Sequence, residues 1–328
     1  MKTRILLISI ASVVVCFSRS LGQDVVFSQF YANPLYLNPA FAGNSDGPRL
    51  SFNFRNQWPS LNASFVTYSA GFDQYLPAIR GGVGILLLAD QIGSSAYKQN
   101  QASLIYSNSL RISNSLYLKT GFQYTFISRS LNFSKLIFPE QLNPISGIGP
   151  RPPGSTLPTT ENSITIHDFT AGAILFSENF FIGATFHHLA EPNQSFITDS
   201  KVPLPLRTSI YAGGDIPLSP SYGGETGWTL SPNIIYITQK PAKQINLGAF
   251  LSKGPGSVGL WYRVNDAIIL SGGFRRGKMQ FGYGYDITVS RLRLASPGGS
   301  HEVSLRFIFE NPVMSDRYRY SSVKCPNF

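Results

Sequence analysis

The chain has 328 residues and a formal net charge of +10, yet only 13% of its residues are charged, about half the share usual in soluble domains. It is also rich in glycine, phenylalanine and tyrosine, with 30, 24 and 16 residues. The low charge density argues against nucleic acid as a partner. Beyond the N-terminus no apolar run approaches the ~20 residues of a membrane helix, so helical membrane proteins are excluded.

Residues 1–22 have the composition of a secretory signal peptide. Lys2 and Arg4 give a positive start, and Ile5–Phe17 is an apolar run too short to span a bilayer. Small and polar residues follow, and we expect cleavage near Gly22 or Gln23. An exported basic chain of this kind points to phosphorylated outer-membrane lipid as its acidic neighbour.

The two cysteines limit how the exported chain is held together. Cys16 lies inside the apolar run behind three valines, which disfavours lipidation. Cleavage leaves Cys325 alone, so no internal disulfide framework can form. Cys325 is either an incidental thiol or a site of intermolecular disulfide formation or contact with a periplasmic partner.

Residues 23–48 form a segment with two Asn-Pro pairs in the aromatic stretch "FSQFYANPLYLNPAFAG". Proline donates no backbone hydrogen bond and restricts the residue before it, so the segment is not a wall strand and turns sharply twice. Such an aromatic segment is expected inside the barrel that follows, as a plug, with docking on the periplasmic rim as the alternative. The plug-like motif comprises Asn33, Pro34, Asn38, Pro39, Ala40 and Gly43.

Residues 49–309 alternate apolar and polar side chains with period two. In Leu116–Phe126, for example, large side chains at 118, 122 and 126 interleave with Lys119 and Gln123. Segments of about 9 to 11 residues with this pattern are typical of strands that cross an outer membrane. We predict fourteen: 49–57, 63–74, 80–90, 99–111, 116–126, 164–176, 179–189, 206–216, 226–237, 243–252, 256–263, 265–275, 279–287 and 302–309. The fold class is therefore an all-β, antiparallel transmembrane barrel.

The connections separate a barrel from a soluble β-sandwich. Tight turns are predicted after the fourth, sixth, tenth and twelfth strands, and long connections after the fifth, seventh and thirteenth. This places short turns at one end and long loops at the other, as in outer-membrane barrels with periplasmic turns and outside loops. The tight connection at 264–266 is the one exception. The tail, 310–328, is expected in the periplasm.

No catalytic constellation, cofactor site or metal site is predicted. His187 and His188 are adjacent in a strand and should face opposite sides, so they cannot chelate one ion together. Asp286 and Glu302 are expected to face the lumen and to pair with bases such as Lys119 and Arg306. The glycine-rich runs lie within strands, which excludes a nucleotide-binding loop.

Arg275, Arg276 and Lys278 form a basic turn at the predicted periplasmic end. They and Cys325 are the candidate contacts for a partner. A simply solvated turn is the alternative.

The stretches "FSQFYANPLYLNPAFAG", "LSFNFRNQWPSL", "TYSAGFDQYL", "GGVGILLLADQIG" and "FGYGYDI…GGSHEVSLRFIF" run from Phe27 to about Phe309. They resemble the PorP/SprF family of type IX secretion system membrane proteins of Bacteroidota. The resemblance implies a non-enzymatic outer-membrane barrel that works with the secretion machinery on a secreted surface protein, in some members an adhesin used in gliding. The Asn38-Pro39-Ala40 triplet is also similar to one in the plug of fatty-acid transport barrels.

Two other functions remain open from the sequence. One is an outer-membrane transporter or porin for small or hydrophobic solutes, in which the N-terminal segment moves. The other is a structural barrel or surface-exposed adhesin, in which the long connection at 129–163 is exposed.

Overall fold

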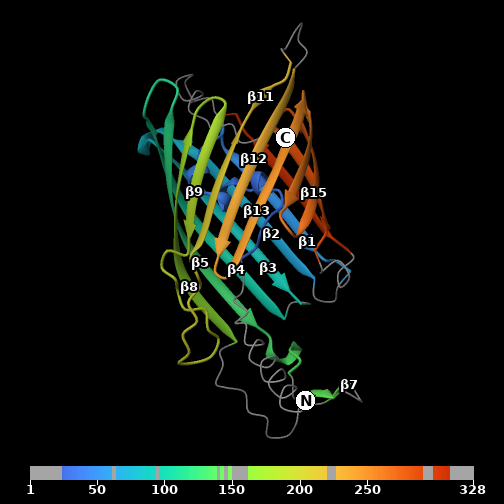
Figure 1. Ribbon diagram of the computed structural model, residues 1–328. Coiled ribbons are helices and arrows are strands. Elements are labelled where there is room, and N and C mark those ends of the chain that lie inside the picture. The colour runs from blue at the N-terminus through green and yellow to red at the C-terminus, as the bar shows by residue number, and fades with distance from the viewer. Residues whose placement is uncertain are drawn as a thin grey trace, which may run out of the picture.

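The wall of the molecule is a closed antiparallel barrel (Figure 1). The computed structural model describes residues 24–60, 64–93, 96–138, 141–143, 147–149, 162–219, 227–290 and 298–310. The wall strands are β1 (Arg49–Gln57), β2 (Phe65–Leu76), β3 (Gly81–Ile92), β4 (Tyr97–Arg111), β5 (Tyr117–Leu131), β8 (Ser163–Phe176), β9 (Phe180–His187), β10 (Arg207–Gly214), β12 (Trp228–Gln239), β13 (Ala242–Lys253), β14 (Gly256–Arg263), β15 (Ala267–Arg276), β16 (Met279–Thr288) and β17 (Ser300–Ile308). The predicted fold class and its fourteen strands are confirmed.

Pairing follows the order of the chain and then closes on itself. The sheet runs from β10 back through β1, continues at β17 and ends at β12, which pairs with β10. The two-residue strand β11 (Ile216–Pro217) only extends the edge of β12. Each backbone ladder is thus completed by a neighbour, as a membrane-spanning sheet requires.

The other elements are short. They are η1 (Phe30–Ala32), α2 (Pro34–Leu37), η2 (Pro39–Phe41), η3 (Pro77–Ile79), η4 (Phe133–Lys135) and the paired strands β6 (Leu142–Asn143) and β7 (Gly147–Ile148). Within the described ranges, no helix has the length and apolarity to cross a membrane.

The side-chain alternation separates the outer wall from the interior. On β5, Phe122 and Phe126 are exposed on the outside, whereas Lys119 and Gln123 are buried inside. The same parity holds on β16, where Phe281 is exposed and Asp286 buried. The expected apolar outer band and polar inner face are therefore present.

The two ends of the barrel differ less than the sequence suggested. We call "turn end" the end with the connections at 112–116, 177–179, 254–255 and 277–278, and "loop end" the opposite one. Three connections at the loop end are tight, at 93–96, 240–241 and 264–266, and the connection at 215–227 at the turn end is long. The sequence predicted only 264–266 as an exception, because the predicted strand ends beside 93–96 and 240–241 fell one to two residues short of the observed ones.

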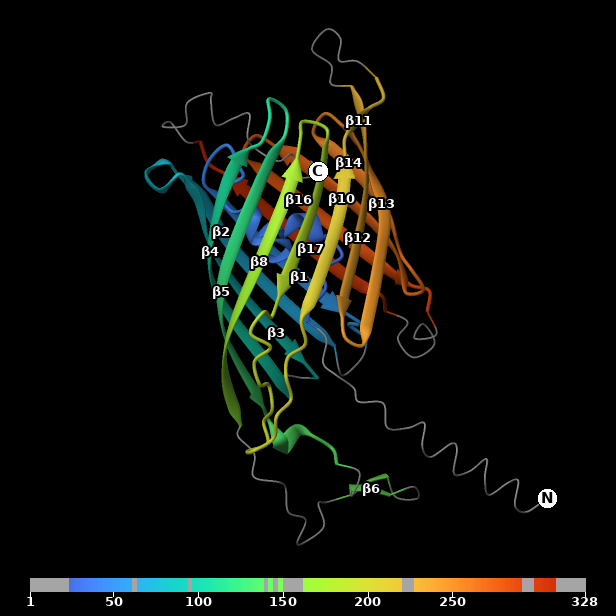
Figure 2. The ribbon, with the colours of Figure 1, turned by 60° about the vertical axis from the view of Figure 1, so that its left-hand side comes forward.

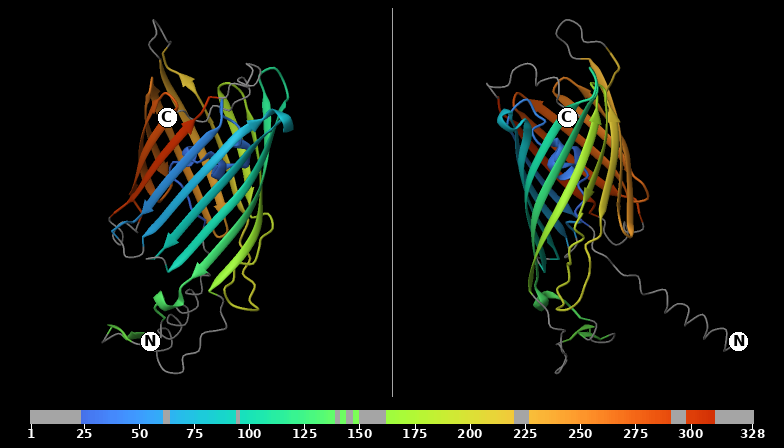
Figure 3. Two further views of the ribbon diagram at one scale, coloured as in Figure 1. Left: turned by 180° about the vertical axis from the view of Figure 1, so that it is seen from behind. Right: turned by 90° about the vertical axis from the view of Figure 1, so that its left-hand side faces the viewer.

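The wall is also uneven in height. β5 continues to Leu131, five residues past its predicted end, because its alternation persists and it pairs with both β4 and β8 there. Figure 3 shows β5 and β8 reaching beyond the other strands at the loop end. Most of the Pro/Gly-rich stretch at 146–160 lies outside the described residues.

Residues 24–48 lie inside the barrel and cross it from end to end (Figure 2). Asp24 contacts residues at the loop end, and β1 begins with Arg49 at the turn end. Buried side chains of this segment join three apolar clusters with the inner wall; their members from the segment are Leu37, Ala40 and Phe41, then Tyr31 and Ala32, then Leu35 and Ala42. The molecule's apolar core is thus built around this segment.

Candidate functional site

The N-terminal segment begins with an ionic anchor at the loop end. The Asp24 carboxylate lies 2.5 Å from His188 Nε2, and His188 Nδ1 lies 2.7 Å from the Asp168 carboxylate. Gln239 donates from its amide to Asp24 at 3.2 Å and accepts from the Asp24 backbone at 3.1 Å. The anchor therefore joins the segment to β8, β12 and the residue that follows β9.

The anchor sets the charge of its members. Burial alone would lower the pKa of His188, but Asp24 and Asp168 raise it to about 9, so the ring is protonated near neutral pH and donates from both nitrogens. Burial would likewise raise the pKa of Asp24, but the charges of His188 and Arg207 hold it well below its ordinary value. The anchor is an ion pair rather than a neutral hydrogen bond.

The expectation that His187 and His188 face opposite sides is wrong. Both rings are buried in the interior, and their centroids are 6.3 Å apart. β9 ends at His187, and His188 takes a left-handed backbone with φ of 61°. That local turn cancels the strand alternation on which the expectation rested.

A second ionic group ties the segment to the last strands. The backbone N–H groups of Ser28 and Gln29 donate to the Glu302 carboxylate at 2.8 and 2.9 Å. Arg55 bridges Glu302 and Asp286, each at 3.0 Å. Arg263 lies 3.3 Å from Asp286. The segment's backbone thus donates hydrogen bonds to Glu302, while Arg55 and Arg263 of the wall balance the charges of the two acids.

The lumenal position of Asp286 and Glu302 was expected, but the suggested partners are wrong. Lys119 donates to the Ala42 carbonyl at 3.0 Å, and Arg306 donates to Gln280 and to the Tyr31 carbonyl, each at 2.9 Å. Both bases donate to the backbone of the segment, and the acids pair with Arg55 and Arg263. The N-terminal segment accounts for this difference, because its backbone carbonyls lie inside the barrel within reach of both bases.

The two Asn-Pro pairs each open a short helix. Pro34 is the first residue of α2 and Pro39 the first of η2, where a missing N–H costs nothing. Asn38 caps η2 through the N–H of Ala40 at 2.8 Å, and its amide also donates to Tyr211 on β10 at 2.9 Å. Asn33 donates to Ser69 on β2 at 2.9 Å. The motif thus reaches two separated parts of the wall.

Glycines in the wall make room for the motif. Gly121 on β5 and Gly172 on β8 are cross-strand partners directly beneath Asn38 and Ala40. A Cβ at Gly121 would overlap the backbone of Pro39 and Ala40, and one at Gly172 would overlap the Asn38 side chain. Gly43 has φ of 60°, and a Cβ there would lie 2.6 Å from the Gly82 Cα. The glycines are visible in the sequence, but the sequence does not show that they form this seat.

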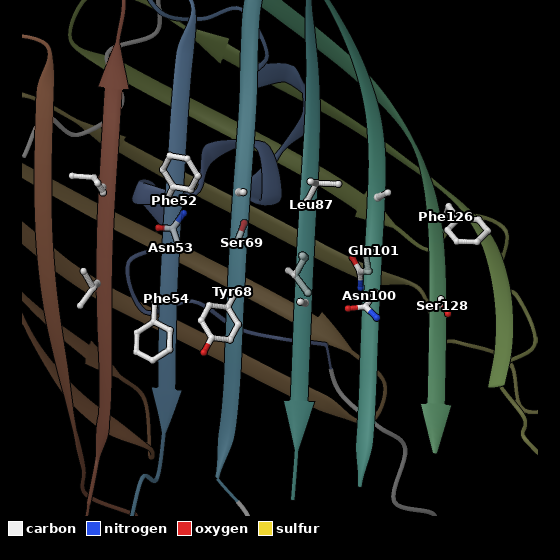
Figure 4. A pocket seen from close by; sticks show the side chains of 16 residues that line it. Phe52, Asn53, Phe54, Tyr68, Ser69, Leu87, Asn100, Gln101, Phe126 and Ser128 are labelled. Carbon is white, nitrogen blue, oxygen red and sulfur yellow. The ribbon is translucent and has the colours of Figure 1, made fainter. Parts of the chain in front are cut away.

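An inner cavity and an outer groove lie along the barrel. A cavity of about 570 Å³ lies inside at the loop end, against Asp24 and Val25. A groove of about 600 Å³ lies outside, over β1 to β5 and β17, between Phe52, Tyr68 and Phe126 (Figure 4). The groove is part of the apolar outer band, which faces lipid in barrels of this type.

The basic turn lies exposed at the turn end. Arg275, Arg276 and Lys278 all point into solvent, and Lys278 forms an exposed ion pair with Glu310 at 3.1 Å. Cys325 lies outside the described residues, so the structure does not relate it to this turn. In the described part of the chain, no three His, Cys, Asp or Glu side chains gather as a metal site would require.

A family model described as "Type IX secretion system membrane protein PorP/SprF" matches residues 20–307. The chain belongs to the PorP/SprF family. This family is a component of a secretion system and not an enzyme family, and membership implies association with the type IX machinery. No match to a curated protein was found.

Solved structures similar to this PorP/SprF protein are outer-membrane barrels. The Ralstonia pickettii toluene transporter TbuX is 9% identical with a TM-score of 0.47, and a Pseudomonas aeruginosa FadL homologue is 12% identical with a TM-score of 0.42; each comparison covers 85% of this chain and 94% of the other. Acinetobacter baumannii Omp33 is 8% identical with a TM-score of 0.45, over 81% of this chain and 100% of its own. The likeness extends to the barrel fold and no further.

Proposed function

We propose that this PorP/SprF protein is an outer-membrane accessory of type IX secretion that supports the export or surface attachment of secreted proteins such as adhesins. In this proposal residues 1–22 are cleaved as a signal peptide, and the turn end faces the periplasm. The exposed basic turn contacts an acidic part of the machinery, and the loop end holds or hands over the exported protein.

The observation that carries the proposal is the packed interior. Residues 24–48 fill the middle of the lumen, with ion pairs at the loop end and hydrogen bonds to both sides of the wall. Glycines in β5 and β8 let the motif lie directly against the wall. A barrel with a packed interior can bind other proteins at its two ends and on its outer wall, but its described residues leave no wide aqueous channel through its middle. This arrangement favours a role as an accessory protein of the secretion machinery.

The test compares the surface and secreted proteomes of cells with the gene, without it and with it restored. Loss and recovery of one or several exported proteins, with the other outer-membrane proteins unchanged, is the expected result and names the substrate. An unchanged secretome combined with impaired uptake of a small solute would instead favour a transporter in which the segment 24–48 moves. N-terminal sequencing of the purified protein tests cleavage near Gly22 or Gln23.

A further inference from the structure

The inner cavity at the loop end has the dimensions of a ligand site. Its volume of about 570 Å³ falls within the range of about 300 to 1,000 Å³ usual for such sites. Its lining combines the start of the N-terminal segment with the loop-end residues of β1, β2, β3, β10, β12, β13 and β14. Trp58 and Val264, which lie in connections between strands, also line it, so the cavity reaches the loop end.

Most ionic groups around this cavity already have partners. Arg55 is matched by Asp286 and Glu302, at 3.0 Å each. Arg263 pairs with Asp286 and with Asp266 at the rim. Asp24 is shared by His188 and Arg207. None of these groups needs a ligand to balance its charge.

Asp90 on β3 is the exception among the acids that line the cavity; Lys243, a further lining base, is exposed to solvent. The Asp90 side chain lines the cavity and is only 7% exposed. Thr67 donates to its Oδ1 at 2.6 Å, and no Lys, Arg or His among the described residues lies within ion-pair distance. A buried carboxylate without a counter-ion is costly, and an incoming cation relieves that cost.

An aromatic pair lines the same cavity. The rings of Trp58 and Phe65 meet edge to face, with centroids 5.5 Å apart, and both residues border the cavity together with Asp90 and Thr67. Aromatic faces beside an acid are a common way of holding organic cations, because the ring quadrupole adds to the attraction of the carboxylate.

We propose that this cavity binds an organic cation, an ammonium or guanidinium group, with Asp90 as its counter-ion and Trp58 and Phe65 as its aromatic wall. The group is carried either by a lysine or arginine of a polypeptide at the loop end or by a small free amine. The inference goes beyond the secretion role and does not depend on it, since it rests on the charges and geometry of the cavity.

The test is a binding titration on the purified full-length protein in detergent. The probes are capped arginine amide and its citrulline counterpart, which keeps the shape and loses the charge. We expect arginine to bind at least about tenfold more tightly than citrulline, as loss of a charge pair in a buried site implies. Equal binding of the two probes, or none by either, would overturn the proposal, and this comparison needs no variant.

Variants then assign the counter-ion. Asp90→Asn should lower arginine affinity about tenfold, while Asp90→Glu should keep most of it. The matched control is Asp46→Asn, which removes an exposed acid outside the cavity and should change nothing. Unchanged affinity in Asp90→Asn would rule out this residue as the counter-ion and overturn the proposal.

A longer probe identifies the source of the cation. A five-residue peptide with a central arginine that binds more tightly than capped arginine assigns the site to a polypeptide. Equal affinity of the two assigns it to a small amine. Failure of all these probes would leave the proteome test of the secretion role unaffected, because that test measures export in cells.

Discussion

The side-chain amide of Asn38 donates to the Tyr211 hydroxyl at 2.9 Å, although 173 positions of sequence separate the two residues. Asn38 is fully buried, and the same side chain accepts from the Ala40 N–H. One residue thus caps a helical turn of the N-terminal segment and fixes that turn to the wall.

Replacement of Asn38 by alanine should destabilise the protein by about 2 to 3 kcal/mol. The loss combines a helix cap with buried hydrogen bonds to the wall. Denaturant unfolding of the refolded protein measures it. Asn108→Ala, which changes an exposed asparagine on β4, is the control and should stay within about 0.5 kcal/mol of the wild type. Equal stability of the two variants would contradict the assigned role of Asn38.

Gly121→Ala should dislodge the N-terminal segment. The new methyl group would overlap the backbone of Pro39 and Ala40, which cannot rotate away as a side chain can. Limited proteolysis followed by mass spectrometry should detect cuts within residues 24–48. Gly272→Ala is the matched control, because the nearest atom to a Cβ at Gly272 is 3.9 Å away. Protection of residues 24–48 in both variants would disprove the seat.

The anchor of His188 should make stability depend on pH. The folded pKa of about 9 lies above the ordinary histidine value of 6.5, so the stabilisation is complete below about pH 6.5 and is lost as the pH rises through 9. The lowered pKa of Asp24 acts oppositely: its contribution is present above the ordinary value of 3.8 and is lost as the pH falls below it. Denaturation midpoints at pH 6, 8 and 10 test the basic limb. In the His188→Gln variant the denaturation midpoint should change less between pH 6 and pH 10 than in the wild type. An equal change in the two proteins would refute the role of His188 in this pH dependence.

The basic turn is the predicted contact with the secretion machinery. Replacing Arg275, Arg276 and Lys278 together with serine should leave the barrel assembled, because all three side chains are exposed. Crosslinking in cells should then recover less of the machinery with the variant. Lys240→Ser, an exposed lysine at the loop end, is the control. Undiminished recovery with the triple variant would exclude the turn as a contact.

The strands were predictable because their signal is local. Alternation within about ten residues distinguishes the inner face from the outer, and it located all fourteen wall strands. Strand ends were less accurate: β5 runs on to Leu131 because pairing with its neighbours continues there, which the stretch itself does not reveal.

The contacts of the interior were not predictable from the sequence. Arg55 and Asp286 lie 231 positions apart, and only the closure of the barrel brings them together. The sequence identified Asp286 and Glu302 as lumenal acids but not their partners. His188 was misplaced because one residue with positive φ reverses the alternation. The glycines that contact the N-terminal segment can be seen in the sequences of the strands, but the sequence does not show which residues pack against them.

The first residues of the N-terminal segment bind the last strands to be synthesised. Ser28 donates to Glu302 across 274 positions, and the same carboxylate holds Gln29. The interior is therefore complete only when the C-terminal strands are present, and β1 pairs with β17 around the N-terminal segment. Closure of the wall and packing of the interior therefore depend on the same strands. A chain truncated before β16 would lack both the last two wall strands and the acids, Asp286 and Glu302, that bind the N-terminal segment.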